Sequence, residues 1–297
     1  MKTAAALPWL GPAFLAMAWL VAKVHWFWNN NPDLQFGWIV LLLCGYLFWE
    51  AWGTRPALDP RPRAWALALG CIGLPLLFLV QVYQVALGPN ASSTVGLALG
   101  VLLVVAANLG VVFGWTGITA FGMAFGFILI AMPMPSIVQG PIVGGLQSLV
   151  ARIDVEVLNL LGIPAQQVGS LIHLPNGTVG IDEACSGIRS LQSTIMAALF
   201  MGYVALKRNS LRLVLFGAGV VLAIVGNIGR SLYLSLMAHW RGIESIEKVH
   251  DAAGWSVLAF TAAGVILLSW LIGKAEKATE TNAADAAQLE PEDVPSQ

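Results

Sequence analysis

The chain has 297 residues, of which 58% are apolar and 10% are charged, and its formal net charge is -1. An ordinary globular domain carries about 25% charged residues, so this composition excludes a typical soluble protein. The net charge says nothing about nucleic acid, but no basic stripe with interleaved aromatic residues indicates it, so no nucleic-acid partner is expected. The lipid bilayer is the partner that the composition predicts.

Long apolar runs predict transmembrane helices. No Asp, Glu, Lys or Arg occurs between Ala64 and Ala151, and one spanning helix needs about 20 apolar residues to cross a hydrocarbon core about 30 Å thick. Runs of this length form helices rather than alternating strands. The sequence therefore predicts an all-α polytopic membrane protein, a bundle of about eight transmembrane helices. The predicted spans cover residues 4–22, 36–50, 64–86, 94–113, 117–133, 187–206, 212–236 and 253–273.

Basic residues in the short connections predict the orientation. They precede the first span, follow the last one and fill two of the connections. Alternating the side at each span places all of them on one side, which the positive-inside bias makes the cytoplasm. Both termini are therefore expected in the cytoplasm. The first span resembles a signal peptide, but its apolar run is long for that role, and we expect an uncleaved span.

The segment between the fifth and sixth predicted spans is expected on the outer side of the membrane. Residues 140–162, which include Arg152, Asp154 and Glu156, predict an amphipathic helix at the membrane surface. Residues 168–181 read as two short extended runs around Asn176-Gly177, a strong hairpin signal. This outer-face hairpin precedes Cys185.

The composition changes after the last predicted span. Residues 1–274 are expected to form one multi-span membrane domain. Residues 275–297 are acidic and rich in alanine, with proline near the end, and they carry too little apolar surface to fold. We expect a disordered acidic cytoplasmic tail there.

Three polar residues are predicted to meet near the outer surface. Cys185 precedes a span that runs inward, Arg230 lies near the end of a span that runs outward, and His250 precedes the final inward span. A cysteine at a helix N-terminus gains thiolate character from the helix dipole, and an ionisable residue inside a membrane indicates function. In acyl transfer, the arginine would stabilise the thiolate or the oxyanion and the histidine would transfer protons.

Three further residues are auxiliary candidates. Arg189 lies four positions after Cys185, hence on the same helical face, where it could hold a substrate carboxylate or Glu183. Asn227, one turn before Arg230, indicates a polar pocket. One outer-face cysteine and scattered histidines do not supply a zinc site, so neither a metal nor another cofactor is expected.

The string Glu183-Ala184-Cys185-Ser186-Gly187-Ile188-Arg189, followed by Asn227-x-x-Arg230 and by His250 ahead of a last span, resembles the exosortase/archaeosortase family. The resemblance covers about residues 135–273, the exosortase-like core. It implies about eight spans and a catalytic triad of Cys185, Arg230 and His250, with the histidine typical of the bacterial branch.

The resemblance also implies a function. The substrates would be exported proteins with a C-terminal sorting signal, made of a short motif such as Pro-Glu-Pro, a transmembrane helix and a basic cluster. Cys185 would cleave the signal at the periplasmic face of the bacterial inner membrane and pass the acyl group to water or to an acceptor amine. Exopolysaccharide-assembly proteins are further partners that the resemblance suggests.

Two alternatives from other classes remain open. A bundle of about eight spans with a buried arginine is also typical of a small-molecule transporter, although the sequence shows no inverted repeat or paired broken helices. A membrane acyltransferase would use the same Cys185 nucleophile on a lipid or thioester donor, without a peptide groove. The acyl group trapped on the cysteine would distinguish the acyltransferase from the peptidase.

Overall fold

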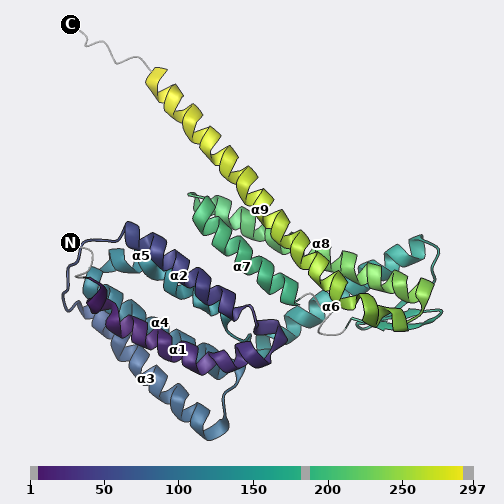
Figure 1. Ribbon diagram of the computed structural model, residues 1–297, viewed down its shortest axis with the longest axis horizontal. Coiled ribbons are helices and arrows are strands. Elements are labelled where there is room, and N and C mark those ends of the chain that lie inside the picture. Colours follow the sequence, from purple (N-terminus) through teal and green to yellow (C-terminus); the bar gives the residue numbers. More distant parts are fainter. Residues whose placement is uncertain (1–5, 182–187, 290–297) are drawn as a thin grey trace. The chain divides into compact units, whose positions relative to one another are not determined.

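The computed structural model describes residues 6–181 and 188–289, and the chain divides into two compact units, Met1–Pro141 and Ile142–Gln297. Both units are helical, and the second adds a small sheet (Figure 1). The first unit contains α1 (Gly11–Asn30), α2 (Gly37–Gly53), α3 (Ala64–Leu87), α4 (Ala91–Phe113) and α5 (Trp115–Gly126), with 3-10 helices at Leu7–Leu10, Pro32–Leu34 and Phe127–Ala131. Helix α6 (Ser136–Leu160) leads into the second unit, which continues with β1 (Gln166–Val168), β2 (Leu171–Leu174), β3 (Gly177–Gly180), α7 (Ile188–Ala205), α8 (Asn209–Arg241) and α9 (Glu244–Leu289).

Six helices of the described part are long and apolar enough to cross a membrane. They are Leu7–Asn30, Pro32–Gly53, Ala64–Leu87, Ala91–Phe113, Asn209–Arg241 and Glu244–Asn282. A seventh candidate is the pair Trp115–Ala131 and Ser136–Leu160, which is bent by 71° at the break between its two helices. The prediction of an all-α multi-span membrane protein is confirmed, with six to seven candidate spans where the sequence predicted about eight.

The difference in number comes from two of the predicted spans. Predicted span 117–133 is the short helix α5 and a 3-10 segment, and it stops before Pro133 and Pro135, whose rings do not continue a helix. Predicted span 187–206 corresponds to helix α7, which the structure describes over 18 residues, Ile188–Ala205. Polar residues in its first two turns, such as Gln192, reduce its hydropathy. Both segments are helical, but neither is a candidate membrane span by itself.

Glycines allow close packing of α3 against α4 in the first unit. A Cβ atom on Gly73 would lie 2.9 Å from the Cβ atom of Leu103, and one on Gly100 would lie 2.6 Å from Cδ2 of Leu77. Small residues at such positions let two helix backbones approach each other closely, a common device in membrane proteins. These glycines therefore hold the α3–α4 hairpin together by contact rather than by polar bonds.

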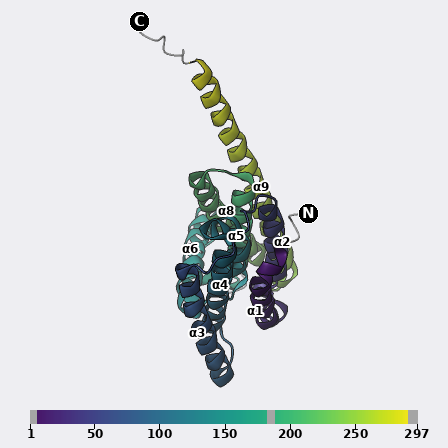
Figure 2. The ribbon, with the colours of Figure 1, turned by 90° about the vertical axis from the view of Figure 1, so that its left-hand side faces the viewer.

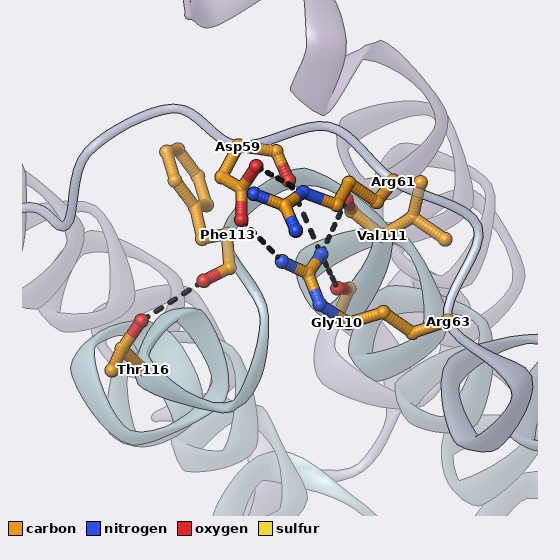
Figure 3. A network of polar contacts seen from close by, with 7 residues as sticks. All are labelled: Asp59, Arg61, Arg63, Gly110, Val111, Phe113 and Thr116. Atoms are coloured by element: carbon orange, nitrogen blue, oxygen red, sulfur yellow. Dashed lines mark hydrogen bonds and ion pairs between the residues drawn. The ribbon is translucent and has the colours of Figure 1, made fainter.

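A polar network covers the end of α4 (Figure 3). Nη1 of Arg63 donates to the carbonyl oxygens of Gly110 and Val111 at 3.0 and 3.1 Å, and its Nη2 atom lies 2.7 Å from a carboxylate oxygen of Asp59. The backbone amides of Asp59 and Arg61 donate to the carbonyl oxygens of Val112 and Val111, respectively. The last carbonyls of a helix lack intrahelical partners and carry partial negative charge, so this connection caps α4.

Helix α6 packs an apolar stripe against the sheet and α8 in the second unit. Arg152 and Glu156 are exposed, as expected for an amphipathic helix. Asp154 differs from the prediction, because it lies on the buried stripe with 0% of its surface exposed. The stripe repeats at helical spacing through Val150 and Leu158, and position 154 falls between them on the same face.

The predicted hairpin at residues 168–181 is present as β2 and β3, and β1 adds a third antiparallel strand. Leu174 pairs with Gly177, so Pro175 and Asn176 form the turn. Gly177 has a φ angle of +139°, which an L side chain rarely adopts. Nδ2 of Asn176 donates to the carbonyl oxygen of His239 at 2.8 Å. The turn is therefore attached to the last turns of α8.

Helices α7, α8 and α9 pack against one another, and α9 continues well past α8 (Figure 2). It runs to Leu289, through residues that the sequence assigned to a disordered tail; the tail's last residues, 290–297, lie outside the described residues. Alanine and glutamate are strong helix formers, which explains the helical extension. The carboxylate of Glu276 accepts hydrogen bonds from the backbone amides of Lys207 and Arg208 at 3.0 and 2.8 Å. Glu276 thereby caps the beginning of α8.

Candidate functional site

Arg230 and His250 form a hydrogen-bonded pair between α8 and α9. Nη2 of Arg230 lies 3.0 Å from Nε2 of His250, and both side chains are half-buried. Because a guanidinium only donates, Nε2 of the imidazole is the acceptor and carries no proton in this geometry. Nδ1 of His250 lies 3.2 Å from a carboxylate oxygen of Asp251 and therefore carries the proton of the neutral ring. The imidazole is thus held with its basic nitrogen toward the arginine.

The α8–α9 hairpin creates this contact. Helix α8 ends at Gly242, whose φ angle of +85° allows the chain to reverse direction, and α9 begins at Glu244. Gly254 lies opposite the guanidinium: a Cβ atom at this position would be 3.4 Å from Nη2 of Arg230. A larger residue at 254 would occupy the space that the arginine uses. The glycine therefore leaves room for Arg230 between the two helices.

A buried polar face of α8 continues from the arginine. Asn227 is 3% exposed and Ser231 is 4% exposed, and their spacing of four residues places them on one helical face. The fully buried carboxyl group of Asp154 in α6 lies near the side chain of Ser231. The sequence predicted the polar pocket from Asn227 but missed Ser231 and Asp154. The four-residue spacing of Asn227 and Ser231 is the signal that would have found the serine.

The antiparallel register of α7 and α8 brings the start of α7 near the same level. Gly202 lies beside Arg212, and Gly219 lies beside Thr194 and Ala198. The two helices are therefore antiparallel, and each residue nearer the start of α7 lies beside a residue nearer the end of α8. On this register Ile188, the first described residue of α7, is level with about residues 226–229 of α8.

Cys185 and Glu183 lie outside the residues that the structure describes. Cys185 precedes Ile188 by three positions, so their Cα atoms are separated by at most about 11 Å of extended chain. Arg189 is exposed in the first turn of α7. The structure thus brings Arg230 and His250 together, with Asn227 one turn before Arg230 on α8, and it describes α7 from Ile188 onward.

The two cysteines of the described part and two of its other histidines lie elsewhere. Cys44 is buried in α2 and Cys71 is exposed in α3, so both belong to the first unit. His25 bonds to its own helix, and His173 lies 2.8 Å from the hydroxyl group of Thr178 in the sheet. Within residues 6–181 and 188–289, no group of three or more His, Cys, Asp or Glu side chains could hold a metal ion.

Comparison with known proteins identifies the family. The model of the transmembrane exosortases, of the EpsH type, matches residues 28–267, which is more than half of the chain and extends well before the region 135–273 that carries the sequence motifs. No curated protein and no solved structure matches the chain. The family match covers helices α2 to α8 and the first half of α9, including the Arg230–His250 pair. The chain therefore belongs to the transmembrane exosortase family, and this membership implies a membrane sorting transpeptidase.

Proposed function

We propose that the chain is a membrane-embedded cysteine protease or transpeptidase that cleaves the C-terminal sorting signal of exported proteins. Cys185 is the nucleophile, Arg230 stabilises negative charge and His250 transfers protons. The hydrogen bond between Arg230 and His250 carries this proposal, because it joins two residues from different helices that acyl transfer needs in one place. Family membership supports the same reaction class.

Two features of α7 support the role of Cys185. The sequence predicts that Cys185 lies at the N-terminus of this helix, which the structure describes from Ile188 onward, and partial positive charge at a helix N-terminus favours a thiolate. The register of α7 on α8 supports the same role, because Ile188 is level with the turn of α8 just before Arg230. Both features support a reaction in which a Cys185 thiolate acts together with the guanidinium and the imidazole.

The chemistry follows from the state of the imidazole. Nε2 of His250 takes the proton of the Cys185 thiol, and its hydrogen bond from Arg230 is released in the same step. The thiolate attacks the scissile carbonyl carbon, and the Arg230 guanidinium stabilises the resulting oxyanion. As the peptide C–N bond breaks, the imidazolium donates its proton to the leaving amine, and a thioester remains on Cys185.

The second half of the reaction regenerates the enzyme. His250 accepts a proton from water or from an acceptor amine, which attacks the thioester carbon. The C–S bond breaks, and the leaving thiolate of Cys185 takes a proton back from the imidazolium of His250, which restores the thiol and the neutral ring. Hydrolysis gives a free carboxylate on the exported protein, and transpeptidation gives an amide to the acceptor.

The proposed location is the bacterial inner membrane, with both termini in the cytoplasm and the site facing the periplasm. The basic residues of the connections support this orientation through the positive-inside bias. In this orientation the released sorting signal keeps its transmembrane helix in the bilayer, and the exported domain leaves on the periplasmic side.

The test is the processing of a co-expressed exported protein with a Pro-Glu-Pro type C-terminal signal. We expect the wild type to shorten this substrate, whereas Cys185→Ala leaves it intact, and Arg230→Ala and His250→Ala slow its processing at matched membrane abundance. Cys71→Ala and His25→Ala are controls that remove another thiol and another imidazole, and both should process normally. Mass spectrometry should find a peptide thioester on Cys185.

Three results would contradict the proposal. Normal processing by Cys185→Ala would exclude Cys185 as the nucleophile. A lipid-derived acyl group on Cys185, in place of the substrate peptide, would favour the membrane acyltransferase. Wild-type protein that processes no substrate with a sorting signal, but moves a small solute across vesicles, would favour the transporter.

A further inference from the structure

A groove of about 590 Å³ runs between α8 and α9 on one side of the Arg230–His250 pair. Its lining residues recur at helical spacing on both helices, so each helix contributes one face. They are Val225, Gly226, Gly229, Arg230 and Tyr233 from α8, and Lys248, Val249, Ala252, Ala253, Ser256, Val257 and Phe260 from α9. The α9 face extends from Lys248 to Phe260, which corresponds to a length of about 18 Å.

The groove opens on the apolar surface of the unit rather than into its core. Val225, Tyr233 and Phe260 on its rim are 52%, 42% and 48% exposed. Helices α8 and α9 are both candidate membrane spans, so the exposed apolar residues of their spanning parts face the hydrocarbon region. An occupant must therefore reach the groove from within the bilayer and must be apolar along most of its length.

The two cations of the groove lie at one end. Lys248 is exposed in the second turn of α9, and Arg230 lies toward the α8–α9 connection, with its Nη2 atom bonded to His250. The opposite end, around Val225 and Phe260, is apolar. This charge distribution fits an elongated apolar ligand that carries an anionic group near one end.

Many of the residues that line the groove are small. Glycine, alanine and serine account for five of the lining positions, and small residues let another helix backbone approach closely in a membrane. A Cβ atom added to Gly229 would meet no atom within 4 Å, so the space above this residue is open. Gly226, in contrast, contacts Val257 and holds the two helices together.

We propose that this groove seats the transmembrane helix of the sorting-signal substrate, with a substrate carboxylate just before that helix placed against Arg230 and Lys248. The inference rests on the proposed function, because it places the scissile peptide beside His250. About 18 Å of groove would hold roughly 12 helical residues, more than half of a hydrocarbon core about 30 Å thick. The groove therefore positions the helix lengthwise, and the peptide that precedes the helix meets the catalytic groups.

Site-specific photo-crosslinking tests docking without chemistry. Benzoylphenylalanine replaces Val225 in the groove or, as the control, Val214, which lies on the same helix outside the groove and is 56% exposed. Both are placed in a Cys185→Ala background, which leaves the substrate uncleaved. We expect irradiation to join the intact substrate to position 225 and not to position 214. Capture of the substrate at both positions alike, or of phospholipid alone at position 225, would overturn the inference.

A matched pair of glycines tests the same groove through processing. Gly229→Leu fills the groove, whereas Gly217→Leu adds the same side chain to another exposed position of α8 where a Cβ atom meets nothing within 4 Å. At equal abundance we expect Gly229→Leu to slow processing at least tenfold and Gly217→Leu to change it less than twofold. The crosslink should also fall in Gly229→Leu. If processing depends on Cys185 but neither variant differs from the wild type and position 225 captures no substrate, the docking inference fails while the proposed function stands.

Discussion

The Arg230–His250 contact predicts a strong energetic coupling between the two residues. The arginine donates a charge-assisted hydrogen bond of 3.0 Å to a half-buried imidazole, and such a bond contributes about 1.5–3 kcal/mol. Since about 1.4 kcal/mol corresponds to a factor of ten, the contact is worth about 10- to 150-fold in rate. Proton transfer by a positioned side chain typically adds about 10²- to 10⁴-fold. Removal of either side chain should therefore slow processing strongly. Removal of both should slow it by less than the product of the two single effects.

The perturbation is a double-mutant cycle of Arg230→Met, His250→Ala and the double variant. Methionine keeps much of the length and the apolar stem of the arginine but removes its charge and its donors. We expect each single variant to lower the processing rate by about 10²- to 10⁴-fold, and the double variant to lie within about tenfold of the slower single variant. Two residues that act as one unit show this non-additivity.

The assay is the rate of substrate shortening in proteoliposomes that contain equal amounts of each variant. The coupling free energy follows from the four rates, and we expect at least about 1.5 kcal/mol. Effects of the two substitutions that add to within about 0.5 kcal/mol would refute the reasoning, because they would mean that the residues act independently. His25→Ala, in the first unit, controls for general effects of histidine removal.

Three further predictions concern residues around the site. Asp251→Asn should slow processing by no more than about threefold, because this carboxylate is 94% exposed and exposed pairs contribute about 0–1 kcal/mol; a much larger loss of processing would show that the imidazole depends on it. Glu276→Gln should lower the melting temperature more than Glu280→Gln. Glu276 is 6% exposed and caps the beginning of α8, whereas Glu280 only pairs with an exposed lysine. Equal melting temperatures of the two variants would contradict the capping role. Gly177→Ala should destabilise the hairpin by about 1–3 kcal/mol, because Gly177 has a φ angle of +139°. Protease-resistance assays should then show earlier cleavage within residues 166–181. Unchanged protease resistance would contradict the predicted destabilisation.

Much of the fold could be predicted from the sequence. Apolar runs place helices at all eight predicted spans, and Asn176-Gly177 correctly indicated a hairpin. The predicted span 4–22 ended too early, because helix α1 continues to Asn30 through Lys23 and His25, which interrupt the apolar run. A hydropathy pattern depends on side chains, whereas a helix ends where its backbone hydrogen bonding stops. Long polar side chains are tolerated near a membrane surface, so a helix can continue past the end of its apolar run.

The candidate site was predicted only in part. The motifs around Cys185, Arg230 and His250 name residues of the kinds that acyl transfer needs, and their catalytic roles stay a prediction. The sequence could not show that Nε2 of His250 accepts from Arg230, since the two residues are 20 positions apart and their distance depends on the α8–α9 hairpin. It also included Asp154 in an amphipathic helix at the membrane surface, but it did not indicate that this carboxyl group is fully buried near Ser231.

The sequence by itself determined that the chain is a multi-span helical membrane protein of the exosortase family, because hydrophobicity and motif order are properties of the chain. Only the tertiary structure decided which polar residues meet, that a groove borders them, and that Glu276 caps a helix from another part of the chain. The physical reason is that these features depend on the register of antiparallel helices. A helix rotates by about 100° per residue, so a shift of a single position would turn Arg230 away from His250 without changing the hydropathy pattern.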